Sequence, residues 1–357
     1  MPNSAATALI SNLYPAGSSP VRMRSRSARK TSSTFVWYFG VAIMYQIYMT
    51  LWLMSRCFDI KYFSRLSKWT NMPKNSGKPV GIVGTGRVGR TLDGAFRAAG
   101  CATVLIRGRW ENAPHALSDC DVAFLAVPDG EIRTVARRLA EELSADLPPL
   151  AHLSGALSTD ELAAFAPNST PVGSFHPFLP FSTAREPAAL HGVTIGIEAS
   201  TPELHAMLEH LARQIQAVPR AVPKESRALY HAAAVTASAQ VVALASHAST
   251  MLTQLGWTTQ DALATLLPLI SGTVTNLSDA GLPGALSGPL RRGDASTIKT
   301  NLEALRELNS PTIEETYRLL SLTGIELAES LGLEPGAVSD LRDVVNYSRP
   351  SATGSGL

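Results

Sequence analysis

The stretch from Pro79 to Gly89 constrains the fold more than any other part of the chain. A short apolar run, Val80 to Val83, has the length of a buried parallel strand and leads into the pattern Gly84-x-Gly86-x-x-Gly89. A helical stretch follows, from Arg87 to Ala99. Strand, glycine-rich turn and helix in this order are the context that a dinucleotide-binding fingerprint requires. The sequence therefore predicts a Rossmann-type nucleotide-binding unit here.

The three glycines and their neighbours are the expected cofactor contacts. Gly84 allows the tight turn, Gly86 has no Cβ and lets the backbone approach a pyrophosphate, and Gly89 lets the helix pack closely on the strand. The free N–H groups and positive dipole end of the helix favour a bound phosphate. The predicted contacts at this turn are Gly84, Thr85, Gly86, Arg87, Val88 and Gly89. The alternative is a glycine-rich strand–helix turn without a ligand.

The second expected strand, Ala102 to Ile106, ends in a basic segment. An enzyme that prefers NAD usually places an acid at this strand end to bind the ribose 2′-OH, but the first acid here is Glu111. Arg107 and Arg109 suit a 2′-phosphate instead, because a guanidinium matches phosphate oxygens in a fork. We therefore predict NADP(H) in preference to NAD(H). The alternative is that both arginines are solvated loop charges.

Charge is distributed unevenly along the 357 residues. Residues 1–76 hold ten basic residues and one acid, which leaves 21 basic and 28 acidic residues in the remainder. This excess of acidic residues over residues 77–357 argues against nucleic-acid binding, which needs a basic face. The three cysteines show no metal-ligand spacing, so we expect no metal site and a reducing compartment.

The N-terminal 76 residues form a basic extension. Residues 1–34 lack hydrophobic periodicity and are predicted to be disordered, whereas residues 35–54 are apolar enough and long enough for a transmembrane helix. Basic residues on both sides leave its orientation open. Three interpretations compete: a membrane anchor, an atypical export signal, or an extension ahead of a true start at Met72. We expect a cytoplasmic protein or, with an anchor, a body on the cytosolic side, where NADPH is found.

An α/β pattern extends over residues 77–222. Further strands are expected at 121–127, 149–153, 172–175, 193–197 and 217–222, with helices at 130–143 and 201–216. Ligands bind outside the carboxyl ends of the strands in an open α/β sheet. Val127 and Pro128, together with Ser154 and Gly155, are therefore predicted beside the nicotinamide half of the cofactor.

An all-helical domain is expected over residues 223–347, followed by a tail at 348–357. One long helix is predicted from 224 to 255 and a second over 258–280, with a break near Pro268. After a loop at 281–294, three more helices are expected at 295–308, 311–331 and 335–346. Long Ala-rich helices with small surface residues suit close packing across a two-fold axis, so we predict a homodimer through this domain.

This layout resembles the superfamily of pyrroline-5-carboxylate reductase, 6-phosphogluconate dehydrogenase and ketopantoate reductase, in which a Rossmann domain precedes an all-helical domain. The closer resemblance is to bacterial proteins with a Rossmann-like domain and a helical domain of unknown function. It covers residues 77–345, and the stretches that carry it are His152–Gly155, Ser174–Pro177, Lys224–Ala234 and Leu286–Asp294. The resemblance implies the fold and a nicotinamide cofactor, but no substrate.

Hydride transfer requires a proton donor or electrostatic clamp near the reacting carbon. The catalytic candidates are Lys224, His231 and His176; the resemblance implies Lys224, since related dehydrogenases use a lysine near the start of this helix to polarise the substrate oxygen. The predicted substrate-binding residues are Ser154, Gly155, Tyr230, Asn276, Arg291 and Arg292, with the arginine pair as a carboxylate or phosphate clamp. The competing interpretation of each is structural: a solvated lysine, hydrogen-bonded histidines, or a surface ion-pair cluster.

The leading hypothesis is an NADP(H)-dependent oxidoreductase that acts on a small, anionic carbonyl or imine compound. Two alternatives from other classes stay open: an NADP(H)-binding sensor without turnover, and a membrane-tethered scaffold.

Overall fold

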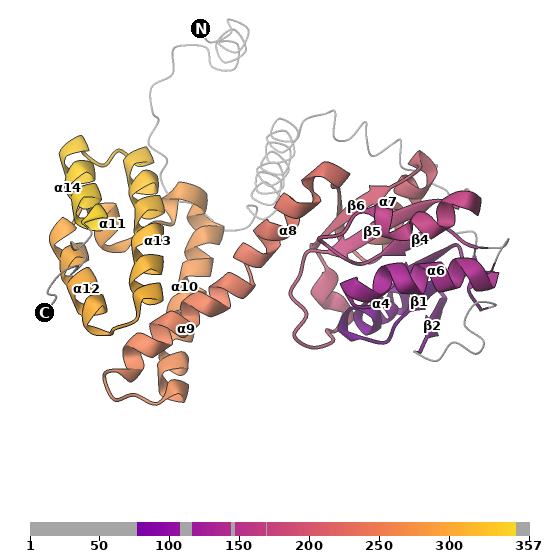
Figure 1. The fold of residues 1–357 in the computed structure, drawn as a ribbon, viewed down its shortest axis with the longest axis horizontal. Coiled ribbons are helices and arrows are strands. Elements are labelled where there is room, and N and C mark those ends of the chain that lie inside the picture. The colour runs from indigo at the N-terminus through magenta and orange to yellow at the C-terminus, as the bar shows by residue number, and fades with distance from the viewer. Residues whose placement is uncertain (1–76, 108–115, 144–146, 169, 348–357) are drawn as a thin grey trace, which may run out of the picture. The chain divides into compact units, whose positions relative to one another are not determined.

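The computed structural model describes residues 77–107, 116–143, 147–168 and 170–347 (Figure 1). The predicted membrane segment at 35–54, Arg109 and the tail at 348–357 lie outside the described residues.

Seven strands form one sheet in the order β2-β1-β3-β4-β5-β6-β7. They are β1 Val80–Val83, β2 Thr103–Ile106, β3 Val122–Leu125, β4 Leu150–His152, β5 Val172–Pro177, β6 Thr194–Ala199 and β7 Val218–Ala221. The first five are parallel, β6 is antiparallel to β5, and β7 is parallel to β6. The chain moves from β1 to β2 on one side and to β3 on the other, so the direction of the strand order reverses between β1 and β3. The predicted Rossmann-type sheet is confirmed.

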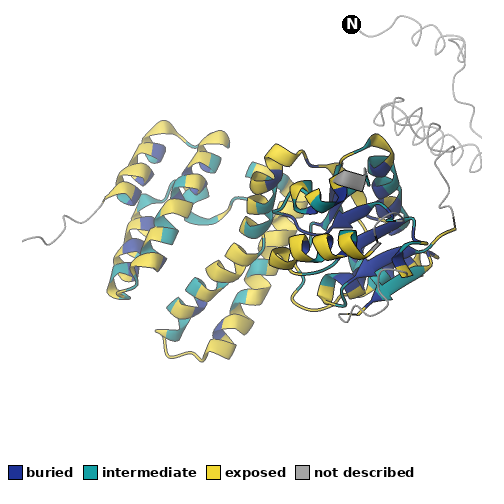
Figure 2. Cartoon of the chain, turned by 45° about the vertical axis from the view of Figure 1, so that its right-hand side comes forward, coloured by how far each residue is buried: buried dark blue, intermediate teal, exposed yellow. Residues whose placement is uncertain are grey.

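Helices cover both faces of the sheet, which explains why β1 and β3 are apolar at every position. Alternate residues face opposite layers. Val80, Ile82 and Phe124 belong to the core cluster that also contains residues of α4 (Arg87–Ala98) and α7 (Pro202–Gln214). Val83 and Leu125 belong to the cluster that contains residues of α6 (Ile132–Leu143). Figure 2 shows these strands as the buried centre of the sheet domain.

The C-terminal region is helical from residue 224 to residue 346, as predicted. It contains a short 3₁₀ helix at Lys224–Ser226, then α8 Arg227–Thr236, α9 Ala239–Thr253, α10 Thr259–Gly284, α11 Gly288–Arg292, α12 Ala295–Glu307, α13 Pro311–Ser330 and α14 Pro335–Asn346. Apolar residues of α12, α13 and α14, among them Ile298, Ile325 and Leu341, form a core of their own.

Three details of the predicted helical region are wrong. The long helix expected from 224 to 255 is interrupted at Ser238, whose φ of −128° and ψ of −80° are not helical and whose hydroxyl donates to the Ala234 carbonyl at 2.6 Å. Such back-bonding competes with the helical ladder. Pro268 is accommodated inside α10, and the break falls instead at Gly281, where φ is +62°. Part of the expected loop at 281–294 forms α11.

One run among the described residues, Lys224–Thr253, meets the length and composition expected of a membrane span. The most apolar 18-residue window of this run has a mean hydropathy of 1.4, and none of the residues in that window is buried. Length and composition alone are weak grounds for a membrane span, because helices of water-soluble proteins also meet them.

Candidate active site

The glycine-rich turn follows β1 at the point where the strand order reverses, the usual place for a ligand in an open α/β sheet. Close packing of the backbone explains why two positions of this turn are glycine. Gly84 has φ of +117°, and a Cβ there would lie 2.3 Å from the Ala126 carbonyl oxygen. A Cβ on Gly89 would lie 2.2 Å from the Gly84 carbonyl oxygen. Both positions require glycine even without a ligand.

Gly86 differs from these two glycines because none of the described residues crowds it. The nearest atom to a Cβ at Gly86, the Ala126 carbonyl oxygen, would be 3.9 Å away, and its φ of −65° suits any residue. Gly86 is the N-cap of α4, no side chain caps this helix, and its first turn holds no acid. The N–H groups there remain available to an anion, and open space lies beside them. These features fit the pyrophosphate of a dinucleotide.

The other predicted cofactor residues surround this turn. Val127 and Pro128 follow β3, the neighbour of β1 in the sheet, after one intervening residue, and Pro128 is exposed. Arg107 is exposed directly after β2. Arg87 opens α4 and donates through Nη1 to the Ser182 carbonyl at 3.1 Å.

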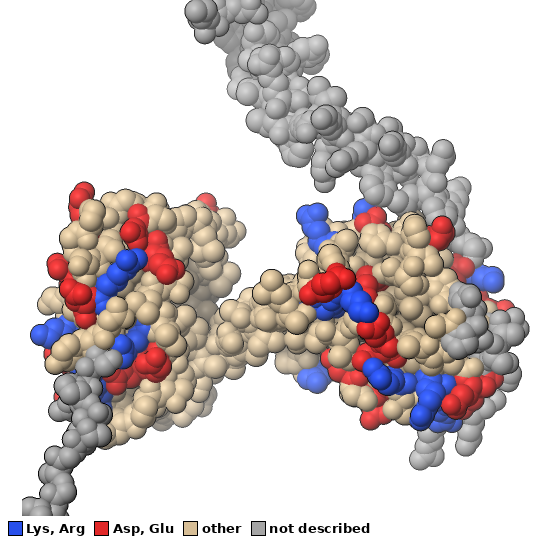
Figure 3. Space-filling view, turned by 45° about the horizontal axis from the view of Figure 1, so that its top comes forward, with Lys and Arg blue, Asp and Glu red and all other residues tan. Residues whose placement is uncertain are grey.

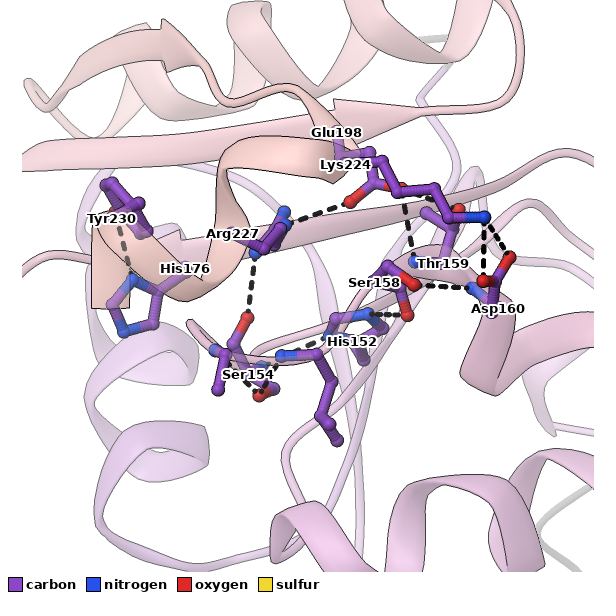
Figure 4. A network of polar contacts seen from close by, with 12 residues as sticks. His152, Ser154, Ser158, Thr159, Asp160, His176, Glu198, Lys224, Arg227 and Tyr230 are labelled. Atoms are coloured by element: carbon purple, nitrogen blue, oxygen red, sulfur yellow. Dashed lines mark hydrogen bonds and ion pairs between the residues drawn. The ribbon is translucent and has the colours of Figure 1, made fainter. Parts of the chain in front are cut away.

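A network of polar side chains begins at the loop after β4 (Figure 4). His152 is fully buried; its Nδ1 accepts from the Ser154 N–H at 3.2 Å, and its Nε2 lies 3.1 Å from the Ser158 carbonyl oxygen. Nδ1 must therefore be unprotonated and Nε2 protonated, since each atom meets one fixed partner. Burial lowers the pKa of His152 to about 4, so the ring is neutral and holds the loop in shape.

The Ser154 hydroxyl is fully engaged in the same loop. It donates to Asp129 Oδ2 at 2.8 Å and accepts from the N–H groups of Ala156 at 3.2 Å and Leu157 at 3.1 Å. A hydroxyl has one hydrogen to donate and two lone pairs, so no capacity is left over. In this structure the side chain of Ser154 shapes the turn that presents Gly155.

Sequence reasoning missed the charged pair at the centre of the network, Arg227 and Glu198. The Arg227 side chain is 2% exposed; its Nε donates to Glu198 Oε2 at 2.9 Å and its Nη1 to the Ser154 carbonyl at 3.1 Å. The other Glu198 oxygen accepts from the Thr159 N–H at 3.2 Å and the Thr159 hydroxyl at 2.7 Å. One ion pair thus joins α8, β6 and the loop after β4.

Three predicted residues, His176, Tyr230 and His231, come together beside this pair. His176 Nδ1 lies 2.9 Å from the Tyr230 hydroxyl oxygen, and the rings of His176 and His231 have centroids 6.3 Å apart. Two glycines leave room for them. A Cβ on Gly155 would lie 2.7 Å from His176 Nε2 and 2.9 Å from His231 Nδ1, and one on Gly196 would lie 2.5 Å from the Tyr230 hydroxyl.

Both partners of the His176–Tyr230 pair are uncharged near neutral pH. Burial, with a smaller effect of nearby His231 and Arg227, lowers the pKa of His176 to about 4. Burial raises the pKa of Tyr230 to about 12. The arrangement can therefore donate or accept a hydrogen bond and move a proton, but it does not hold an imidazolium.

The remaining predicted site residues lie elsewhere. Lys224 is half exposed and pairs with Asp160 at 2.7 Å, a hydrogen bond that raises the pKa of the ammonium. Figure 4 shows it on the other side of Arg227 from His176 and Tyr230. Asn276 is exposed on α10, which packs against α9 and α13, and Arg291 and Arg292 end α11. The structure does not bring these four residues into the His176–Tyr230 cluster.

A signal for Arg227 existed in the sequence. Arg227, Tyr230 and His231 are spaced i, i+3 and i+4, which places them on one face of a helix. Three polar residues on one face of an otherwise Ala-rich helix indicate a polar partner surface. Glu198 gave no comparable signal, because a strand position alone does not reveal which helix covers it.

Comparison with known proteins agrees with this architecture. Residues 193–323 match the family described as "Domain of unknown function (DUF2520)". The matched residues begin just before β6 and include Glu198, Arg227, Tyr230 and His231, so one side of the polar network lies within the matched segment.

Two of the solved structures that share the fold illustrate the likeness. One is a Bacteroides fragilis protein, provisionally named an NADP oxidoreductase, with 21% identity and a TM-score of 0.56; the match covers 70% of this chain and 98% of that one. The other is a Thermotoga maritima protein with 24% identity and a TM-score of 0.54, covering 71% of this chain and 99% of that one. No curated protein matches the chain. The resemblance predicted from the sequence is thus confirmed at the level of fold.

Proposed function

We propose that this protein is an NADP(H)-dependent oxidoreductase that transfers a hydride to or from a small, anionic carbonyl or imine compound. The observation that carries the proposal is the pair of neutral side chains that can exchange a proton, His176 and Tyr230, at the carboxyl end of β5. The uncapped N-terminus of α4 follows β1 of the same sheet. In open α/β sheets the crevice that binds the dinucleotide and the groups that react lie at the same edge, outside the carboxyl ends of the strands.

The cofactor half of the proposal rests on the turn and on the named relative. Gly86 offers open space and free N–H groups where a pyrophosphate would bind. Arg87 directly follows Gly86, and Arg107 follows β2, the strand beside β1. The Bacteroides fragilis protein with the same fold carries an NADP oxidoreductase name. Arg107 supports a preference for NADP(H), because its guanidinium suits a 2′-phosphate.

Two measurements test this proposal. Fluorescence titration with NADPH and NADH gives the two dissociation constants; we expect NADPH to bind more tightly, and tighter NADH binding would contradict the arginine argument. A substrate screen at the NADPH absorbance band, with 2-oxo acids, 3-oxo acids and cyclic imines, tests turnover. Tight NADPH binding without turnover of any class would favour the sensor alternative.

We also propose that a second copy of the chain covers the apolar side of α8, α9 and α10. Residues 228–278 contain Asp261 as their sole charged side chain, and Figure 3 shows a broad surface without charged groups on the helical region. Large apolar side chains are exposed there, including Val242 at 70%, Leu267 at 55% and Leu269 at 69%. An exposed apolar surface of this extent is typical of a subunit interface.

A further inference from the structure

The direction of one hydrogen bond constrains the chemistry of the candidate site. His176 Nδ1 and the Tyr230 hydroxyl oxygen are 2.9 Å apart, and either atom can carry the shared hydrogen. Imidazole is the stronger base and phenol the stronger acid of the neutral pair. The hydroxyl therefore donates and Nδ1 accepts. The proton of neutral His176 must then reside on Nε2.

His176 Nε2 is the free end of this pair. It makes no hydrogen bond within the described part of the chain, and the His176 ring is only partly buried. Nε2 lies against Gly155, at the loop that follows β4, and His231 Nδ1 lies against the same glycine. An N–H donor in this position has its hydrogen available for a bound molecule.

We propose that His176, held by Tyr230 as the Nε2–H tautomer, is the proton donor to a carbonyl oxygen, and hence that the substrate is a ketone or aldehyde and not an iminium ion. The inference rests on the proposed oxidoreductase function and narrows its substrate class. His176 is the catalytic residue of this step, and Tyr230 is a positioning residue that fixes the ring and its proton.

The proton balance of the step is complete within this pair. When bound, the nicotinamide supplies a hydride, with its electron pair, to the carbonyl carbon. The carbonyl π pair moves to oxygen, and this oxygen takes the proton from His176 Nε2 as the new O–H bond forms. Nδ1 takes the Tyr230 hydroxyl proton at the same time, so the imidazole stays neutral. Solvent then delivers one proton to Nε2, and Nδ1 returns its proton to the tyrosinate, which restores the phenol and the Nε2–H imidazole.

An iminium substrate is a poor match for the same geometry. Its nitrogen carries hydrogen and positive charge, so it offers no lone pair to the Nε2–H of His176. The buried Arg227 guanidinium adds a positive potential at His176, which is one reason for the lowered pKa of that ring. Both features disfavour a cation beside Gly155 and favour an oxygen on which negative charge develops.

Nitrogen NMR of the histidine rings tests the tautomer without any turnover. Full-length protein labelled with ¹⁵N-histidine is recorded at pH 7, with and without NADPH, in long-range ¹H–¹⁵N spectra. We expect the His176 ring to be neutral with its proton on Nε2. The signals that disappear in His176→Gln identify those of His176. His152, whose hydrogen bonds require the same tautomer, serves as an internal reference. In Tyr230→Phe, which keeps the ring but removes the hydroxyl, His176 should show both neutral tautomers.

Turnover of matched compounds tests the substrate class. A panel pairs 2-oxo acids with cyclic imines of similar size, and the oxidation of NADPH measures the turnover of each compound. We expect oxo acids to be reduced in preference to imines, and His176→Gln to lower kcat for the oxo acid by about 100-fold or more with an unchanged Kd for NADPH. Tyr230→Phe should lower kcat by a smaller factor. Exposed His191→Gln is the matched control and should match the wild type.

The outcomes separate this inference from the proposed function. An Nδ1–H or doubly protonated His176 at pH 7, or faster reduction of imines than of oxo acids by a protein that binds NADPH, would overturn the inference alone. Failure to bind NADPH would overturn the proposed function itself. A neutral Nε2–H ring that loses its fixed tautomer in Tyr230→Phe supports the donor geometry even before a substrate is known.

Discussion

At the scale of single residues, two imidazole rings meet over a position that has no side chain. Gly155 lies against both His176 and His231, and the Ser154 turn presents it to them. The histidines come from different parts of the fold, β5 and α8, so the absence of a Cβ at one loop position is what allows them to approach.

We therefore predict that Gly155→Ala separates the rings. The new Cβ would lie 2.7 Å from His176 and 2.9 Å from His231, and such overpacking typically costs about 1–3 kcal/mol of the free energy of unfolding. Urea unfolding measures this cost, and the His176 NMR signals report the change of geometry. Gly130→Ala is the control, since nothing lies within 4 Å of a Cβ there. Equal stability of the two variants would contradict the packing argument.

The site could be predicted from the sequence in part. Gly155, His176, Tyr230 and His231 were expected because short polar motifs stand at strand ends and on an Ala-rich helix. Glu198 and Arg227 are 29 positions apart, and their pairing depends on how α8 docks on β6, which no local pattern reveals. Lys224, implied by the resemblance, pairs with Asp160 instead, a contact that likewise depends on tertiary packing.

At the scale of elements, the Glu198–Arg227 ion pair fastens α8 to the sheet. Its side chains are 11% and 2% exposed, so removing one partner leaves a buried charge without compensation. We expect Glu198→Gln to lower the free energy of unfolding by about 3–5 kcal/mol. Glu161→Gln, which breaks the exposed pair with Arg133, should cost about 0–1 kcal/mol. Similar losses in the two variants would rule out a special role for the buried pair.

The loop after β4 should be sensitive to acid. The pKa of His152 is about 4 in the folded protein and about 6.5 when unfolded, so the unfolded state binds more protons between these values. His152 therefore contributes its full stability above pH 6.5 and loses it as the pH falls to 4, a change of about 3 kcal/mol. Urea titrations across this range should show a shallower pH slope for His152→Asn. An unchanged slope would mean that His152 does not titrate on unfolding; exposed His191→Asn is the control.

The elements themselves could be predicted better than their interruptions. The strand Val80–Val83 follows from its continuous apolar run, and the helices of residues 295–346 follow from helical periodicity. The break at Ser238 depends on a hydroxyl bonding to the Ala234 carbonyl, and Pro268 is tolerated inside α10; neither outcome is visible in an apolar pattern.

At the scale of the whole molecule, the uncharged side of α8, α9 and α10 predicts self-association. Light scattering with size exclusion should give twice the chain mass of 38.0 kDa. Val242→Glu and Leu267→Glu place charges on side chains that are 70% and 55% exposed, and we expect both variants to be monomeric. Val218→Glu, on β7 of the sheet domain, is the control and should stay dimeric. A monomeric wild-type protein at micromolar concentration would contradict the proposal.

The central claim is that the turn after β1 binds the pyrophosphate of NADP(H), and Gly86→Ala tests it most directly. Within the described part of the chain, the added methyl group would meet no atom closer than 3.9 Å, so the midpoint of thermal unfolding should stay at the wild-type value. The same methyl group would occupy the space of the pyrophosphate, and we expect the affinity for NADPH in a fluorescence titration to fall at least about tenfold. A wild-type protein that does not bind NADPH, or a Gly86→Ala variant that binds it equally tightly, would contradict the account.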